Sequence, residues 1–314
     1  MHALGIDIGG TKIAGALVAN DGTILAETRR PTPAADSHQI VETVAEMIAE
    51  LRISGDAVAV GVAAAGFIDA ERANVVYSPN LSWRNEPLKA RIEAKVDLPV
   101  FIENDANAAG WAEYRYGAGR GSKHMMMLTI GTGVGGAIVT DGELFRGGFG
   151  IGAEFGHMNY MPDGLDCGCG QRGCLEQYGS GTALLKSAKQ LVASGAATSA
   201  RLAQLEKDAG ELTGAQVYQA ITEGDEGALA CLTNLSNHLG RALASLAALL
   251  DPEIAVIGGG VSAVGDMLLD PIRESYLAHL PARGFRPELQ LKQAELVNDA
   301  GVVGAADLAR ASVA

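Results

Sequence analysis

The chain of 314 residues has few aromatic side chains and an excess of acidic over basic residues. It contains 2 Trp and 6 Phe, and 24 basic residues stand against 37 acidic ones, a net charge of −13. Nucleic-acid-binding proteins usually carry a basic patch, and no stretch here supplies one, which excludes a nucleic-acid partner. Glycine and charge interrupt every apolar run before it reaches bilayer length, and no leader segment precedes the first predicted strand. We therefore expect a cytoplasmic protein without a membrane partner.

What the chain has in quantity is glycine and aliphatic residues, which indicate an α/β protein with many tight turns. There are 41 glycines, and Ala, Val, Leu and Ile supply the apolar content typical of buried strands that alternate with helices. Strands are predicted at 2–8, 13–19, 23–28, 57–62 and 100–102, and helices after Asp36, Pro87 and Asn107. A last helix is predicted over about 304–312.

The opening pattern of strand, glycine turn, strand and Asp-Gly turn occurs twice. Residues 6–22 show it first, and residues 125–142 repeat it to within two residues. This repetition predicts an internal duplication of a βββαβα half. The second half resumes at a strand over 254–257, after an insertion that holds a cysteine cluster and a helical stretch over about 180–250.

Three of the four cysteines lie within eight residues and follow a histidine. His157, Cys167, Cys169 and Cys174 offer one imidazole and three thiolates, the set that closes a tetrahedral structural zinc site. Clustered thiols in a chain without a secretory signal favour a metal site over disulfides. Glu154 and Glu176 flank this set, and a metal that is already four-coordinate does not need them. The cluster either fixes these carboxylates for recognition of a small polyol or only staples a loop.

Two glycine turns indicate phosphate binding. The first turn contains Gly9 and Gly10 and is followed by the hydroxyl of Thr11 and the amine of Lys12. A similar turn occurs at residues 131–133. Backbone amides that glycine leaves exposed can cradle phosphate oxygens, although a glycine pair can also be a plain hairpin turn. Because the turns join two strands, they are neither a Walker P-loop nor a dinucleotide fingerprint. The residues assigned to ATP in this way are Gly9, Gly10, Thr11, Lys12, Gly131, Thr132 and Gly133, with Gly258, Gly259 and Gly260 assigned to adenosine.

Asp105 is the best candidate for a reactive carboxylate. It follows the carboxyl end of a predicted parallel strand, where open α/β sheets place their chemistry. A base at this position would accept the proton of an attacking hydroxyl during phosphoryl transfer. A second interpretation, compatible with the first, is that the Asn104–Asn107 segment caps a helix. Asp7, at the end of the first strand, is the natural second acid and would hold Mg²⁺ through water.

These residues together resemble the ROK family of sugar kinases, and most closely its glucokinase branch. The resemblance covers nearly the whole chain through Asp7–Lys12, Glu103–Asn107, Gly131–Gly136, Glu154–Glu176 and Ile257–Ser262. Of these segments, Glu154–Glu176 is the one specific to this family. The resemblance implies a duplicated, actin-like (ribonuclease-H-like) fold of two domains with a zinc-binding insertion. We expect a smaller domain over 1–118, completed by a C-terminal helix at about 302–314, and a larger domain over 119–301.

The resemblance also implies a reaction and a role for each residue. The reaction is ATP-dependent phosphorylation of glucose at the 6-hydroxyl, with Asp105 as the base. His157 would turn one ring nitrogen to zinc and the other to the sugar, because metal ligation fixes the ring. Many members have a proline in the loop that reads Ala63–Gly66 here, so that loop is expected to be less rigid. The sugar contacts implied are Gly66, Asn80, Asn104, Asp105, Glu154, His157 and Glu176.

Two other functions fit the same resemblance. A kinase for another hexose, such as N-acetylmannosamine, N-acetylglucosamine, fructose or mannose, would use the same catalytic parts. A sugar-sensing repressor is less consistent, because the few residues before Asp7 leave no room for a helix-turn-helix. Members of the family are commonly homodimers or tetramers, so a homo-oligomer is expected. The choice between ATP and polyphosphate as the phosphoryl donor stays open at this point.

Overall fold

The computed structural model describes residues 1–78 and 81–314 and divides into two compact units. The first comprises Met1–Met126, Gly136–Ala153 and Glu295–Ala314, and the second comprises Met127–Gly135 and Glu154–Ala294. The domain division predicted from the sequence assigns residues 119–126, 136–153 and 295–301 differently and stays a prediction. Asn80 lies outside the described residues. Among the helices described, none is long and apolar enough to cross a membrane.

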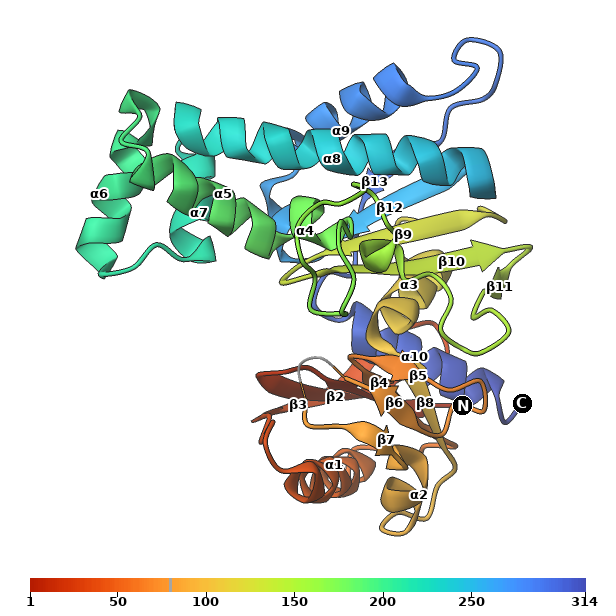
Figure 1. The fold of residues 1–314 in the computed structure, drawn as a ribbon. Helices are drawn as coiled ribbons and strands as arrows, with labels where there is room; N and C mark the ends of the chain where they lie inside the picture. The colour runs from red at the N-terminus through yellow and green to blue at the C-terminus, as the bar shows by residue number, and fades with distance from the viewer. Residues whose placement is uncertain (79–80) are drawn as a thin grey trace. The chain divides into compact units, whose positions relative to one another are not determined.

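The sheet of the first unit has helices on both faces (Figure 1). Its strand order is β3-β2-β1-β4-β8, with the first three strands antiparallel and β1, β4 and β8 parallel. Leu4, Ile6 and Val62 belong to a core that also contains the apolar side of α1. The elements are β1 (Ala3–Ile8), β2 (Lys12–Val18), β3 (Ile24–Pro31), α1 (Ser37–Arg52), β4 (Val60–Ala64), α2 (Leu88–Glu93), β8 (Val100–Asn104), α3 (Asp105–Tyr116) and α10 (Ala300–Ala311).

The C-terminal helix α10 lies directly on the other face of this sheet and beside α3. A Cβ atom on Gly5 or on Gly61 would lie 1.9 Å from the carbonyl oxygen of Val302 or Ala305, respectively. The helix can approach β1 and β4 so closely because these two strand residues have no side chain. The sequence predicted α10 from residue 304; it begins at Ala300, because Val302 and Val303 are already buried against the sheet.

The second five-stranded sheet repeats the order of the first. Its order β11-β10-β9-β12-β13 matches β3-β2-β1-β4-β8 strand for strand, which confirms the predicted duplication. The strand β13, which closes this sheet, was not predicted, nor was the small sheet of β5 (Phe67–Ile68), β6 (Val75–Tyr77) and β7 (Arg84–Glu86) in the first unit. The strands are β9 (Met125–Ile130), β10 (Val134–Thr140), β11 (Glu143–Leu144), β12 (Ile254–Gly258) and β13 (Gln290–Gln293).

The insertion between β11 and β12 contains the cysteine cluster and a group of helices (Figure 1). The long helix α8 packs along α9, and α5, α6 and α7 pack against one another. A Cβ atom on Gly240 would lie 2.5 Å from the carbonyl oxygen of Ile272, so α8 and α9 are also in close contact at a glycine. The helices of the insertion are α4 (Glu176–Gly179), α5 (Gly181–Ala193), α6 (Ala200–Ala209), α7 (Gly214–Thr222) and α8 (Glu226–Leu250), with one-turn helices η1 (Phe155–His157) and η2 (Ala197–Ser199). The one-turn helix η3 (Gly260–Val264) and α9 (Asp266–His279) follow β12.

Candidate active site and metal centre

Asp105 stands at the start of α3, immediately after β8, but it does not cap the helix. That function belongs to Asn104, whose side-chain oxygen accepts a hydrogen bond of 2.9 Å from the Asn107 amide. Asp105 Oδ1 accepts one bond of 3.0 Å, from the Ala106 amide. Burial raises the pKa of the Asp105 carboxyl, although bonds from backbone amides oppose the rise. Asp105 thus has a raised pKa and is not used as the helix cap, and such a carboxylate is suited to accept a proton.

Asp7 lies in β1, two strands from β8 in the same sheet, with Ala63 of β4 opposite it. The pKa of its carboxyl is raised from 3.8 to about 7, first by burial and second by the charge of Asp105, while Lys12 opposes the rise. A buried carboxylate whose pKa is raised by the charge of a second carboxylate is a place where a divalent cation is favourable. Asp7 therefore fits the predicted magnesium role, because a bound Mg²⁺ would neutralise its charge.

The first glycine turn presents its central residues to solvent. Gly9 is held by its amide, which donates to the Lys12 carbonyl at 3.0 Å, and by its carbonyl, which accepts from the Thr32 hydroxyl at 2.7 Å. Gly10, Thr11 and Lys12 are exposed. The turn is thus fixed at its base and open at its tip, as a phosphate cradle requires.

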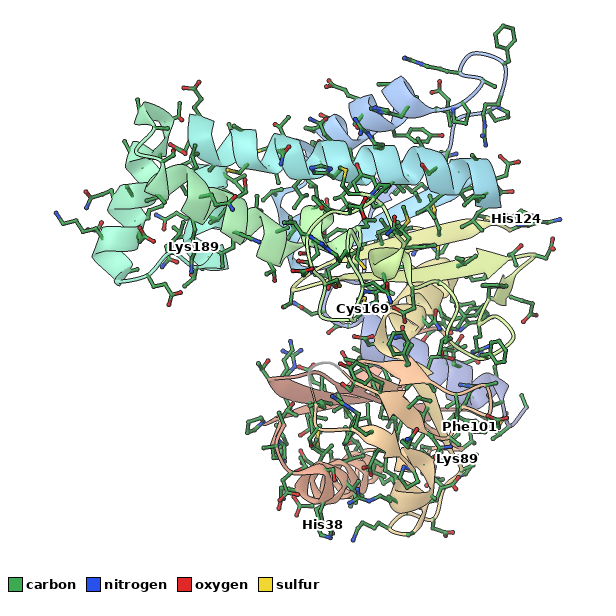
Figure 2. The ribbon with its side chains drawn as sticks, viewed as in Figure 1. His38, Lys89, Phe101, His124, Cys169 and Lys189 are labelled. Atoms are coloured by element: carbon green, nitrogen blue, oxygen red, sulfur yellow. The ribbon has the colours of Figure 1, made fainter. Side chains whose placement is uncertain are left out.

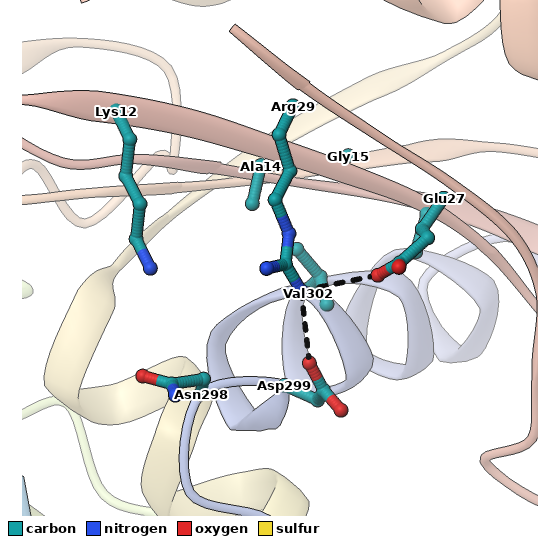
Figure 3. A pocket seen from close by; sticks show the side chains of 9 residues that line it. Lys12, Ala14, Gly15, Glu27, Arg29, Asn298, Asp299 and Val302 are labelled. Carbon is teal, nitrogen blue, oxygen red and sulfur yellow. Dashed lines mark hydrogen bonds and ion pairs between the residues drawn. The ribbon is translucent and has the colours of Figure 1, made fainter. Parts of the chain in front are cut away.

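Figure 3 shows Lys12 beside the hollow between β2 and the segment that leads into α10. Arg29 lies next to it and pairs with Glu27 at 3.1 Å and with Asp299 at 3.8 Å. The cavity measures about 10 Å³, which is room for a single water molecule. This hollow is therefore too small to be a substrate site.

Gly66 and Asn104, both predicted to contact sugar, are tied to each other. The Asn104 amide nitrogen donates to the Gly66 carbonyl at 3.0 Å. Gly66 has φ of +141°, and a Cβ atom there would lie 2.4 Å from the Tyr77 carbonyl oxygen, so only glycine fits. Ala63 and Ala64 of the loop expected to be less rigid belong instead to β4 and are fully buried. The two sugar contacts stay predictions.

The predicted zinc ligands converge. One ligand atom from each of His157, Cys167, Cys169 and Cys174 lies within 4.8 Å of the other three. The Cys169 and Cys174 sulfurs are 3.6 Å apart, and the Cys167 sulfur is 3.7 Å from His157 Nδ1. Zinc–sulfur bonds of about 2.3 Å and tetrahedral angles place ligand atoms roughly 3.7 Å apart. The four side chains therefore fit a structural zinc ion; Figure 2 labels Cys169.

The ligand geometry assigns the two ring nitrogens of His157. Nδ1 lies on the side of the thiols, so Nε2 is the nitrogen on the other side of the ring. This is the arrangement expected if zinc fixes the ring for a second contact. Glu154 immediately precedes η1, whose last residue is His157. The sugar contacts of both residues stay predictions.

Glu176 begins α4 and reaches the second glycine turn. Its Oε2 accepts from the Val134 amide at 3.1 Å, and a Cβ atom on Gly133 would lie 2.1 Å from the same oxygen. Gly133 is therefore a glycine because the Glu176 carboxylate occupies the place of a side chain. The sequence did not predict this contact, since 43 residues separate the two positions. The sugar contact of Glu176 stays a prediction.

A cavity of about 550 Å³ lies within the second unit, beside Gly131, Thr132 and Gly260. Ligand sites for small molecules usually measure about 300–1,000 Å³ and have mostly apolar walls. Of the three glycines assigned to adenosine, Gly260 lines the cavity. Gly258 is buried at the end of β12, and Gly259 has φ of +85°. The sequence did not single out the other lining residues: Gly181, Thr182, Leu184, Leu185, Gly214, Val217, Tyr218, Ile221, Val261 and Val264.

Known proteins are similar to this chain over nearly its whole length. The model of the ROK family matches residues 3–312. The glucokinase of Streptomyces coelicolor is 45% identical over 308 residues, 98% of this chain and 97% of its own. The N-acetylmannosamine kinase of Escherichia fergusonii is 34% identical and covers 99% of both chains.

The same similarity holds in three dimensions. A crystal structure of a ROK family glucokinase from Streptomyces griseus, in complex with glucose and AMPPNP, has 44% sequence identity and a TM-score of 0.91. The match covers 99% of this chain and 100% of the other. With its matching sequence, duplicated sheets and cysteine cluster, this chain belongs to the ROK family.

Proposed function

We propose that this protein transfers the γ-phosphoryl group of ATP to the 6-hydroxyl of D-glucose, which gives glucose 6-phosphate and ADP. The observation that carries this proposal is Asp105, a carboxylate with a raised pKa that helix capping leaves available. Two comparisons support the substrates: the relative at 45% identity is a glucokinase, and the solved structure at 44% identity holds glucose and AMPPNP.

In this reaction Asp105 accepts the proton of the 6-hydroxyl as the sugar oxygen attacks the γ-phosphorus. The new oxygen–phosphorus bond forms while the bond from the γ-phosphorus to the bridging oxygen breaks, and ADP leaves with that electron pair. Because the transition state is loose, the protein contributes mainly position and charge neutralisation. Mg²⁺, when bound near Asp7, neutralises charge on the phosphate oxygens.

ATP binding divides between the cavity and the two glycine turns. The cavity offers apolar surface from Leu184, Val217 and Ile221 to a flat base, with Tyr218 at its wall. Thr132 lines the same cavity and belongs to the second glycine turn, so a base in the cavity would have its phosphates beside that turn. The Gly9–Lys12 turn is the second phosphate contact in this proposal.

Sugar recognition rests on groups that accept and donate hydrogen bonds to hydroxyls. Glu154 and Glu176 supply carboxylate oxygens, His157 an imidazole nitrogen, and Asn104 and the Gly66 loop an amide and backbone groups. Zinc acts here through the protein, by holding the His157 ring in one orientation. The relative at 34% identity acts on N-acetylmannosamine, so a kinase for another hexose is the second candidate function.

The experiment that tests the function is ADP release from MgATP against a panel of hexoses and N-acetylhexosamines. Wild type is measured beside Asp105→Asn, in which the amide oxygen can still accept the Ala106 amide and so preserve the turn. We expect turnover to be strongest on glucose and to fall about 10²–10⁴-fold in the variant. A preference for another sugar would replace glucose as the proposed substrate and leave the proposed mechanism unchanged. Substantial activity in Asp105→Asn would remove Asp105 from the role of base.

We also propose that the protein is a homo-oligomer. Large apolar side chains stand exposed on its surface, among them Phe149, Leu249 and Phe285. Association with a second copy of the chain would remove such side chains from water. Light scattering coupled to size exclusion tests this proposal, and a monomer at micromolar concentration would refute it.

A further inference from the structure

Glu103 is a buried carboxylate that the proposed mechanism does not use. It lies in β8, two residues before the base, and is 2% exposed. A charge buried to this degree is unfavourable unless it is paired and hydrogen-bonded. Both of its oxygens have partners, and the two sets of partners belong to different parts of the first unit.

The first oxygen, Oε1, holds the turn that carries the base. It accepts from the Asn104 backbone amide and from the Asn107 side-chain amide, each at 3.1 Å. Among the residues that the structure describes, the buried Asn107 side-chain oxygen has no hydrogen-bond partner. The amide is therefore oriented to donate to Glu103, although its own acceptor is left unsatisfied. Asp105 lies between these two asparagines, and its position therefore depends on Glu103.

The second oxygen, Oε2, faces two arginines. Arg146 approaches it with Nε at 2.8 Å and Nη2 at 2.7 Å, and Arg72 Nε lies at 3.6 Å. The two Arg146 contacts are hydrogen bonds between charged groups, the strong class in proteins, whereas the Arg72 contact is an ion pair only. The Arg146 side chain is 26% exposed, so this partner can be substituted with less risk to the fold than Glu103.

Arg146 belongs to the segment 145–153, which directly precedes Glu154 in the chain. Much of the segment is exposed, and Phe149 is the most exposed of its apolar residues. Gly150 packs against the turn before Arg72, since a Cβ atom there would lie 2.6 Å from the Asp69 carbonyl carbon. The Arg146 carbonyl accepts from the Gly152 amide at 2.8 Å, which closes the segment on itself. Arg146 thus joins this segment to the buried carboxylate.

We propose that Glu103 and Arg146 are a positioning pair, in which one carboxylate fixes both the base-bearing turn and the segment before Glu154. This inference rests on the proposed function, with Asp105 as the base. Loss of the pair should displace Asp105 relative to the attacking hydroxyl, and a misplacement of about 1 Å can lower a rate by about 10²-fold. Neither residue of the pair lines the cavity or belongs to a glycine turn, so we expect nucleotide binding to be unaffected.

A double-mutant cycle tests the pair by the separation of kcat from the KM for ATP. We expect Arg146→Met to lower kcat on glucose by about 10–100-fold, with the KM for ATP within about twofold of wild type. Arg146→Lys keeps the positive charge but not the two guanidinium nitrogens that contact Glu103. Its kcat should therefore lie between those of Arg146→Met and wild type. The double variant Glu103→Gln/Arg146→Met should be no slower than the slower single variant, because both substitutions remove one interaction.

The matched control is Arg201→Met, which breaks the exposed ion pair of Arg201 with Glu223 at 2.7 and 2.9 Å and should leave kcat unchanged. Thermal melts show whether each variant is folded, and if Glu103→Gln does not fold, the two Arg146 variants and the control decide the question. A wild-type kcat in Arg146→Met, additive losses in the double variant, or an equal loss in the control would each overturn the pair. A wild type without turnover would instead refute the proposed function.

Discussion

Removal of the Asp7 charge should stabilise the free protein and impair its use of MgATP. Burial and the charge of Asp105 raise the pKa of Asp7 to about 7. The folded state therefore binds the Asp7 proton more tightly than the unfolded state. This preference stabilises the fold at low pH, and the stabilisation is lost as the pH rises from 3.8 to about 7. The variant Asp7→Asn removes this dependence.

The size of the effect follows from the same pKa. Each pKa unit corresponds to about 1.4 kcal/mol, so between pH 5 and pH 8 wild type should lose roughly 3 kcal/mol relative to Asp7→Asn. This is an upper bound, because Asp7 keeps some contact with solvent, which screens its charge. Activity should change in the opposite direction: kcat/KM for MgATP should fall by more than about 100-fold, since a metal contact contributes several kcal/mol.

Urea unfolding of both proteins without nucleotide or magnesium, at pH 5 and pH 8, measures the difference. NMR titration of the Asp7 carboxyl carbon provides an independent readout of its pKa. In Asp105→Asn this pKa should be lower than in wild type, because one of its causes is gone. A difference in unfolding free energy between wild type and Asp7→Asn that is the same at both pH values would refute the reasoning.

Three further outcomes are expected. Cys169→Ser should lose the metal and much stability, because structural zinc in small modules contributes roughly 10–16 kcal/mol, and metal analysis with thermal melts checks this. A metal-free variant of full stability and activity would contradict the zinc site. Chelation should weaken glucose binding before ATP binding, measured by calorimetry, because His157 is both a predicted zinc ligand and a predicted sugar contact. The reverse order would contradict its sugar contact. Gly61→Ala should destabilise the fold by about 1–3 kcal/mol, because the new Cβ would meet the Ala305 carbonyl oxygen at 1.9 Å. Gly148→Ala is the matched control, since a Cβ there would meet no atom of the described residues beyond its chain neighbours within 4 Å.

Several features of this protein follow from short stretches of sequence. The repeated pattern of strand, glycine turn and strand predicted two sheets of equal strand order, because the alternation of apolar residues and turns is a local property. The spacing of His157, Cys167, Cys169 and Cys174 predicted their convergence, since the three thiols are close along the chain and the histidine is ten residues upstream. The position of Asp105 at the end of a buried strand predicted its place at the edge of the sheet.

Other features depend on which segments pack against each other in the folded protein, and this packing cannot be predicted from the sequence pattern. Helix capping by Asn104, rather than Asp105, required the observed turn geometry. Val217 and Tyr218 of α7 form part of the cavity because of how the inserted helices pack, and their own pattern reads as an ordinary amphipathic helix.

The sequence by itself determined the duplicated α/β architecture, the convergence of His157 with the three clustered thiols and the place of Asp105 directly after β8. Each of these depends on residues that are near neighbours in the chain or that repeat at a fixed period. The tertiary structure alone decided that Glu176 occupies the side-chain place of Gly133, and that Glu103 pairs with Arg146 across 43 residues of chain. The physical reason is that a buried carboxylate takes the nearest donors in space, and those are set by packing between distant segments.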